Sequence, residues 1–197
     1  MGPARETGEK ARLRAKLRAV RDAIPPEARQ AASQAIATRA LELPELADTK
    51  AVLLYGATPE EADPALLEAG LRARGVRIAY PRVAGPRGLS LHWVANSAEL
   101  VRGAFGIREP AADAAPVRLD EVEAIVVPGV AFALTGYRLG FGGGYYDTLL
   151  ARTRADAPTI GIAFDEQVVE GLPHESHDRP VSVIVTPTRV IRPKRSG

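Results

Sequence analysis

The chain has 197 residues, of which 46% are hydrophobic and 25% charged, proportions typical of a globular protein with one substantial core. It contains no cysteine, which excludes disulfides, thiol catalysis and cysteine-ligated zinc. Its formal net charge is only +2 and its apolar runs are short, so neither a nucleic-acid-coating protein nor a membrane protein is indicated.

The opening 21 residues carry a net charge of +5, so the remainder carries −3. A helix is predicted over residues 10–23, because apolar side chains recur there every three or four positions. The expected apolar stripe is Leu13, Leu17, Val20 and Ile24, with Lys10, Arg14 and Arg18 on another face. A basic face of this kind is most often merely solvated, and it also suits an anionic ligand. A nucleic-acid-binding helix is a further possibility, although no aromatic residue precedes Tyr55 for base stacking.

The rest of the chain alternates predicted strands and helices. Short apolar runs bounded by turn residues predict strands over residues 50–55, 76–80, 89–94, 123–127, 159–164 and 182–186. Helices are expected over residues 27–43, 63–75 and 145–152, with a turn at 85–88 and a loop at 103–110. This alternation predicts an α/β fold: a largely parallel central sheet with helices on both faces, in three layers. We expect one domain over residues 1–197, with frayed ends at 1–7 and 193–197, and a cytoplasmic location because no signal peptide is recognisable.

A glycine-rich stretch, Gly136 to Asp147, follows the predicted strand 123–127. Four glycines in five positions leave backbone N–H groups able to face an anion, and the predicted helix start at Tyr145 also favours phosphate. Arg138 adds a forked donor, and Asp147 suggests a divalent cation between carboxylate and phosphate. The plain alternative is a tight turn with an acid in the first helical turn. The spacing matches neither a Walker A loop nor the dinucleotide fingerprint.

Four segments resemble, in order, the signature of the 5-formyltetrahydrofolate cyclo-ligase (5,10-methenyltetrahydrofolate synthetase) family. The longest begins with Val-Pro-Gly-Val-Ala-Phe at residue 127 and, after three residues, continues as Gly-Tyr-Arg-Leu-Gly-Phe-Gly-Gly-Gly-Tyr-Tyr-Asp to residue 147. The other three are Lys10-x-x-Leu13-Arg14, Glu61-Ala62-Asp63 and Leu172-Pro173-x-Glu175-x-His177-Asp178. Together they cover nearly the whole chain.

The resemblance implies an enzyme that uses ATP and Mg²⁺ to cyclise 5-formyltetrahydrofolate to 5,10-methenyltetrahydrofolate, with ADP and phosphate as the other products. It implies catalytic roles for Lys10, Arg138 and Asp147, and a Mg²⁺ site at Asp147 and Asp178. The implied ATP contacts are Lys10, Arg14, Arg138, Leu139, Gly140, Gly142, Gly143, Gly144, Tyr145 and Tyr146. The implied folate contacts are Gly56, Glu61, Tyr145 and Tyr146. A monomer without nucleic-acid or membrane partners is expected.

Several alternatives stay open. Glu60 is chemically as plausible a carboxylate as Glu61, and His174 and His177 stand three apart as zinc ligands can, although zinc is disfavoured here. The loop lacks a lysine that many relatives have, Ala133 stands where relatives often have aspartate, and Pro64 departs from the usual threonine. A non-catalytic nucleotide or folate sensor, or an enzyme activating another formamide or carboxylate, would share the same ATP contacts.

Overall fold

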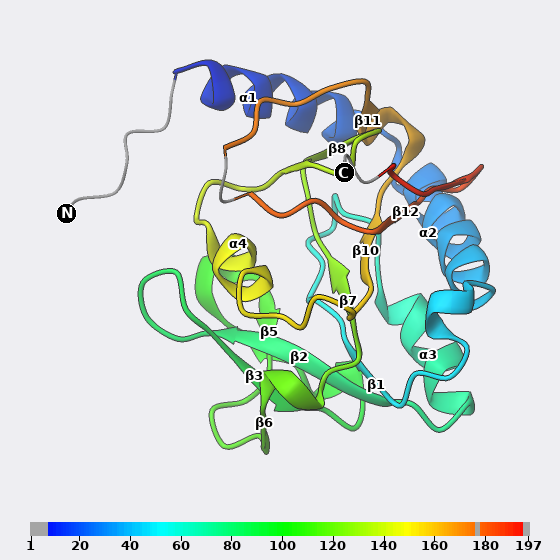
Figure 1. The fold of residues 1–197 in the computed structure, drawn as a ribbon, viewed down its shortest axis with the longest axis vertical. Coiled ribbons are helices and arrows are strands. Elements are labelled where there is room, and N and C mark those ends of the chain that lie inside the picture. Colours follow the sequence, from blue (N-terminus) through cyan, green and yellow to red (C-terminus); the bar gives the residue numbers. More distant parts are fainter. Residues whose placement is uncertain (1–7, 176–177, 195–197) are drawn as a thin grey trace.

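The computed structural model describes residues 8–175 and 178–194, and at its centre is an eight-stranded sheet (Figure 1). The strand order is β13-β12-β10-β7-β1-β2-β3-β6. The five inner strands, from β12 to β2, run parallel, whereas β13, β3 and β6 pair antiparallel at the two edges. The strands are β1 (Ala51–Leu53), β2 (Arg77–Val83), β3 (Leu89–Trp93), β6 (Pro116–Val117), β7 (Ala124–Val127), β10 (Thr159–Ile162), β12 (Val183–Val185) and β13 (Val190–Ile191). The predicted largely parallel sheet is confirmed.

Helices cover both faces of this sheet, which confirms the three-layer α/β prediction. Figure 1 shows α2 (Pro26–Leu41) and α3 (Ala65–Ala73) on one side and α4 (Tyr145–Leu150) on the other. Side chains alternate between the two layers, as the pleat requires: Val52 packs with the α2 and α3 side, and the neighbouring Leu53 with the α4 side. Asp63 accepts a hydrogen bond from the Ala65 amide at 2.9 Å, but Pro64 occupies the N-cap of α3, one residue later than predicted.

A second, three-stranded sheet supports the first helix. Its strands are β11 (Val168–Val169), β8 (Ala131–Ala133) and β9 (Arg138–Leu139), in that order. The helix α1 (Gly8–Asp22) packs on it through Leu13 and Leu17, and Figure 1 shows the helix lying beside β8 and β11. This places the basic opening helix next to the segment that leads into the glycine-rich loop.

The structure corrects several predictions of local structure. Val20 is 41% exposed whereas Arg21 is 1% exposed, so the predicted apolar stripe was wrong at Val20, while Ile24 packs against the core as expected. The segment predicted as a loop over 103–110 contains β5 (Arg108–Glu109), which pairs with β4 (Val101–Arg102). The short 3₁₀ helices were not predicted either: η1 (Pro44–Leu46), η2 (Ser97–Glu99), η3 (Ala104–Gly106), η4 (Leu119–Glu121) and η5 (Asp165–Gln167). Within the described ranges, no helix has the length and apolar character needed to span a membrane.

Candidate active site

The glycine-rich loop joins β9 to α4. Gly142 has φ +101° and Gly144 has φ +69°, both in the left-handed region that side chains strongly disfavour. Gly144 occupies the N-cap of α4 and provides no side-chain cap for the amides of the first turn. The loop conformation therefore requires glycine at these two positions. The helix that follows ends at Leu150, two residues earlier than predicted.

Arg138 and Asp147 face each other across this loop. Nη2 of Arg138 lies 2.6 Å from Oδ1 of Asp147, and its Nη1 donates to the backbone oxygen of Arg179 at 2.9 Å. The Arg138 side chain is only 4% exposed. The guanidinium therefore joins the first turn of α4 to the chain that follows Asp178. It also balances the charge of Asp147.

Two cations of α1 reach the same region. Arg14 Nε donates to the backbone oxygen of Gly140 at 2.6 Å, and its guanidinium lies beside Gly142. Lys10 Nζ lies 3.0 Å from Glu175 Oε1 and 3.5 Å from Asp178 Oδ2. Partial burial lowers the pKa of Lys10, but the two carboxylates outweigh it, so the pKa is raised and the ammonium is retained. Helix α1 thus contacts the loop and the segment that contains Asp178.

Glu61 is a buried carboxylate in the loop between β1 and α3. Its Oε2 accepts a hydrogen bond from the Thr58 amide at 2.9 Å. Burial raises the pKa of Glu61, while the Thr58 amide and the charge of Arg21 act in the opposite direction. Glu60 is only half-buried, and its charge adds to the rise in the Glu61 pKa. Of the two acids left open by the sequence, Glu61 is the one inside the protein.

The two tyrosines at the start of α4 have different surroundings. Tyr146 packs against both core clusters, and its hydroxyl is buried without a hydrogen-bond partner in the described parts of the chain. Burial and the nearby Glu61 raise the pKa of Tyr146, so its hydroxyl stays protonated. Tyr145 is half-buried, and the edge of its ring meets Phe105 with 6.1 Å between ring centroids. Tyr146 is therefore the more firmly packed of the pair.

Gly56 has a structural explanation of its own. A Cβ atom at this position would lie 2.0 Å from the backbone oxygen of Arg108, so the β4–β5 hairpin approaches the end of β1 too closely for any side chain. The requirement for glycine at residue 56 follows from this packing. A folate contact at Gly56 remains a prediction.

Three residues near the site were missed by the sequence reasoning. Arg21 is buried, its Cζ lies 5.7 Å from the centroid of the Phe141 ring, and its charge acts on Glu61. Arg21 follows Arg14 by two helical turns and so lies on the same face of the helix, which is the signal that the sequence offered. Arg87, with φ 58°, extends from the turn after β2 towards Gly144, and Phe105, with φ 56°, contacts Tyr145. The sequence carried no signal for these last two.

The region around His174 gives no support to a zinc site. The His174 ring stacks on Tyr137 with 3.7 Å between centroids, and its Nδ1 lies 3.3 Å from the backbone oxygen of Leu172. His177 lies outside the described residues. Across residues 8–175 and 178–194, no group of three His, Asp or Glu side chains is placed to hold a metal ion. Mg²⁺ is commonly held by one or two carboxylates together with phosphate oxygens and water, so a Mg²⁺ site does not need three protein side chains.

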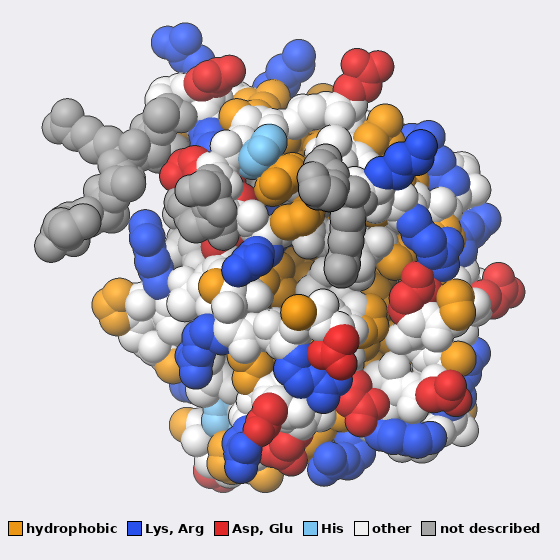
Figure 2. All heavy atoms as spheres, in the orientation of Figure 1, with side chains coloured by type: hydrophobic (Ala, Val, Ile, Leu, Met, Phe, Trp, Pro, Cys, Tyr) orange, Lys and Arg blue, Asp and Glu red, His pale blue; other side chains and the backbone are white. Residues whose placement is uncertain are grey.

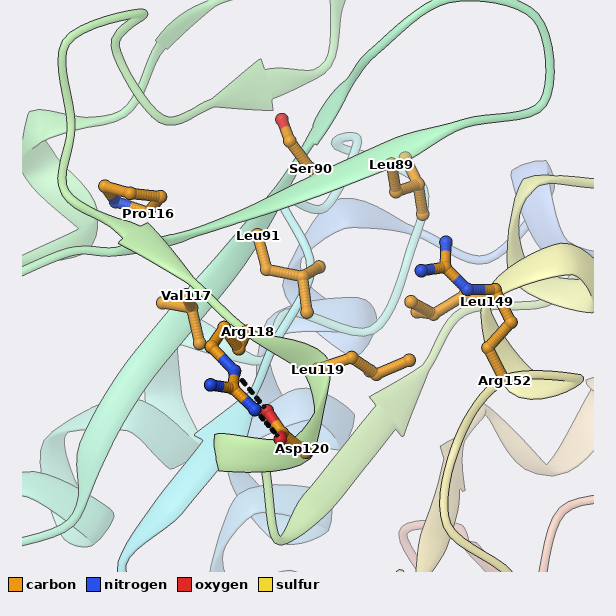
Figure 3. A pocket seen from close by; sticks show the side chains of 10 residues that line it. All are labelled: Leu89, Ser90, Leu91, Pro116, Val117, Arg118, Leu119, Asp120, Leu149 and Arg152. Atoms are coloured by element: carbon orange, nitrogen blue, oxygen red, sulfur yellow. Dashed lines mark hydrogen bonds and ion pairs between the residues drawn. The ribbon is translucent and has the colours of Figure 1, made fainter.

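The described part of the chain has a hollow away from the predicted site, and charges of both signs mix on the face shown in Figure 2. A hollow of about 500 Å³ lies between β3, η4 and the end of α4, lined by residues such as Leu91, Leu119 and Arg152 (Figure 3). None of the predicted site residues lines it. Figure 2 shows Lys and Arg side chains interspersed with Asp and Glu on the visible face. Mixed charge of this kind does not make the face shown in Figure 2 suited to binding nucleic acid.

Comparison with known proteins decides the family. A sequence model of the 5-formyltetrahydrofolate cyclo-ligase family matches residues 6–187. The chain belongs to the 5-formyltetrahydrofolate cyclo-ligase family. It is 35% identical over 180 residues to the 5-formyltetrahydrofolate cyclo-ligase of Escherichia coli K12, covering 88% of this chain and 98% of that protein. It is 31% identical to a probable 5-formyltetrahydrofolate cyclo-ligase of Schizosaccharomyces pombe, covering 81% and 86%. The chain is therefore an enzyme of the ligase class.

Solved structures of relatives agree with the fold. The NMR structure of Aquifex aeolicus 5,10-methenyltetrahydrofolate synthetase superposes with a TM-score of 0.82 at 39% identity, covering 95% of this chain and 94% of that one. A 5,10-methenyltetrahydrofolate synthetase from Mycoplasma pneumoniae gives a TM-score of 0.75 at 21% identity, covering 91% and 99%. At that identity the second match supports the fold alone.

Proposed function

We propose that this enzyme converts 5-formyltetrahydrofolate and ATP to 5,10-methenyltetrahydrofolate, ADP and phosphate, with Mg²⁺ as its metal. The observation that carries the proposal is the convergence of charged groups from distant parts of the chain. Arg14 contacts Gly140, Lys10 contacts Asp178, and Arg138 contacts Asp147. Cations from the first helix and carboxylates from the second half of the chain thus border one glycine-rich loop, as a triphosphate and its metal require.

The chemistry explains why an ATP site suffices without a protein nucleophile. A formamide carbonyl is a poor electrophile because its nitrogen donates electrons into it. Transfer of the γ-phosphoryl group breaks the bond to the β-phosphate and forms a bond to the formyl oxygen. Nitrogen N10 of the folate then attacks the activated carbon and loses its proton, and the carbon–oxygen bond breaks to release phosphate. Both nucleophiles belong to the substrates, so the protein has to align them and stabilise charge.

The residues at the loop would divide this task. Lys10, Arg14 and Arg138 would bind phosphate oxygens and neutralise the charge that spreads over the transferring group. The amides of Gly142, Gly143 and Gly144 would add donors to the same oxygens. Asp147 and Asp178 fit Mg²⁺, since this ion commonly uses one or two carboxylates together with phosphate oxygens and water. The metal would supply further neutralisation of the phosphates. Leu139, Gly140 and the tyrosines would border the nucleotide.

The folate would bind at Glu61. Its buried carboxylate can accept hydrogen bonds from the N–H groups of a pterin ring, and burial strengthens such contacts. Tyr145 offers a half-buried aromatic face for a flat heterocycle, and the unpartnered hydroxyl of Tyr146 can donate to it. With these contacts the folate would lie against the loop side of α4, where the formyl oxygen has to meet the γ-phosphate.

An absorbance assay for methenyl-folate formation tests this proposal. We expect product only when 5-formyltetrahydrofolate, ATP and Mg²⁺ are all present, with one ADP released per product. Nucleotide hydrolysis with another formamide, but not with this folate, would favour a sibling activity. Binding of nucleotide and folate without turnover would favour a sensor.

We also propose that the chain acts as one domain and as a cytoplasmic monomer, which sedimentation and cell fractionation can check.

A further inference from the structure

Arg21 is a buried cation whose hydrogen-bonding capacity is only partly used. Its side chain is 1% exposed. Nε and Nη2 donate to Oδ1 of the neighbouring Asp22 at 3.0 and 2.9 Å. Nη1 is buried and has no hydrogen-bond partner among the described residues. Burying an unpaired N–H of a charged group is costly, so a merely structural arginine would be expected to use this nitrogen.

The position of Arg21 links the loop to the buried carboxylate. Its guanidinium lies over the Phe141 ring, within the glycine-rich loop. Its positive charge acts on Glu61 and lowers the pKa of that carboxyl group against the effect of burial. The hydroxyl of Tyr146, another unpartnered group here, is in turn influenced by Glu61. Thr58, whose amide donates to Glu61, adds a third buried group without a partner in the described protein, its Oγ1.

A carboxylate together with a free guanidinium N–H favours a ligand that presents N–H donors next to an oxygen acceptor. The carboxylate accepts from N–H groups, whereas the guanidinium donates to an oxygen. The pyrimidine ring of a 4-oxo pterin presents this combination along one edge, with an amine and a ring N–H followed by the carbonyl oxygen at C4. A 4-amino pterin replaces that acceptor with a donor. The free N–H of Arg21 can donate to the carbonyl oxygen of a 4-oxo pterin, but it would face another donor in a 4-amino pterin.

We propose that Arg21 Nη1 donates to the C4 carbonyl oxygen of the pterin whose N–H edge is held by Glu61. Arg21 is then a specificity-determining residue for 4-oxo folates. This inference rests on the proposed function, because it takes Glu61 as the folate-binding carboxylate. It assigns to α1 a second task besides contacting the nucleotide: Lys10 and Arg14 serve the phosphates, and Arg21 serves the folate.

The test compares two ligands on three proteins by calorimetry. The ligands are 5-formyltetrahydrofolate and its 4-amino counterpart, and the proteins are wild type, Arg21→Met and the control Arg12→Met, which removes an exposed cation of the same helix. Wild type and Arg12→Met should prefer the 4-oxo ligand by roughly 10–100-fold, as for a hydrogen bond to a charged donor. Because a 4-amino pterin also lacks the N3 hydrogen that Glu61 accepts, Arg21→Met should lose the severalfold part of this preference that the Arg21 donor supplies, and keep its affinity for ADP.

The outcomes separate this inference from the proposed function. Failure of wild type to bind any folate would end both. Folate turnover by wild type with equal affinity for the two ligands, or an unchanged preference in Arg21→Met, would overturn the role of Arg21 alone. Should Arg21→Met fail to fold, Arg21→Lys keeps the charge but loses the forked donor. An unchanged preference in Arg21→Lys overturns the inference, and a loss of at least severalfold supports it.

Discussion

Nη2 of Arg138 lies 2.6 Å from Oδ1 of Asp147, across a loop in which Gly142 and Gly144 adopt positive φ angles. The two residues stand in β9 and α4, so this ion pair holds together the two ends of the glycine-rich loop. The pair also joins a proposed phosphate contact to a proposed metal contact. Changes at either residue are therefore expected to affect the other.

Asp147→Ala should lower turnover about 100-fold at saturating ATP and Mg²⁺, the usual effect of removing one stabiliser of transition-state charge. The matched control is Asp156→Ala, since the Asp156 side chain is 76% exposed and pairs with the nearby Arg154 at the surface. Steady-state rates of methenyl-folate formation give the comparison. Combining Asp147→Ala with Arg138→Met should cost less than the product of the single effects, because the residues are paired. Equal rates for Asp147→Ala and Asp156→Ala would remove Asp147 from the site.

Lys10→Ala should also lower turnover about 100-fold, because Lys10 is proposed to bind the phosphate oxygens. Its control is Lys16→Ala on the same helix, whose side chain is exposed. Because Lys10 also pairs with Glu175 and Asp178, melting curves have to accompany the rates. Normal turnover in folded Lys10→Ala would contradict the assignment of α1 to the nucleotide.

Gly56→Ala should destabilise the fold by about 1–3 kcal/mol, the usual cost of forcing an extra methyl group into a packed region. The added Cβ would meet the Arg108 backbone at 2.0 Å, and a backbone atom cannot rotate away as a side chain can. Gly171→Ala is the control, because its Cβ would meet nothing within 4 Å. Urea unfolding of both variants measures the difference, and equal midpoints would show that the hairpin does not press against Gly56.

Glu61 should make the free energy of unfolding depend on pH. Burial raises its pKa in the folded protein above 4.5, the value of an ordinary glutamate side chain. Between 4.5 and the raised value the folded state binds more protons than the unfolded state, so stability from this group falls as pH rises through that window. Urea unfolding of wild type and Glu61→Gln at several pH values tests this. Glu61→Gln should gain stability relative to wild type across the window, and a difference that does not vary with pH would contradict it.

The sequence predicted six of the eight strands of the central sheet, because these are apolar runs flanked by turn residues, and it missed the short edge strands β6 and β13. The strands around residues 124–127 and 159–162 are buried on both faces and need no partner to be recognised. The strands β8, β9 and β11 span only two or three residues each, too few for any periodicity. They exist because they pair with one another, which a local pattern does not report.

The candidate site, too, was predicted from the sequence only in part. Residues in the family signature, such as Lys10 and Asp178, could be named from the sequence, but their contact at 3.5 Å depends on how distant segments pack. The helical periodicity placed Val20 in the apolar stripe and gave Arg21 no place in the site. In the structure Arg21 is the buried residue and lies towards the loop, whereas Val20 is 41% exposed. Burying a charge against the local pattern is typical of a functional position.

The most direct test of the account is a crystal structure with ADP and Mg²⁺. We expect the phosphates to lie against the amides of Gly142 to Gly144, within reach of Lys10 and Arg14. We expect Asp147 to hold the metal ion. Nucleotide bound elsewhere, for instance in the hollow beside Leu119 and Arg152, would contradict it.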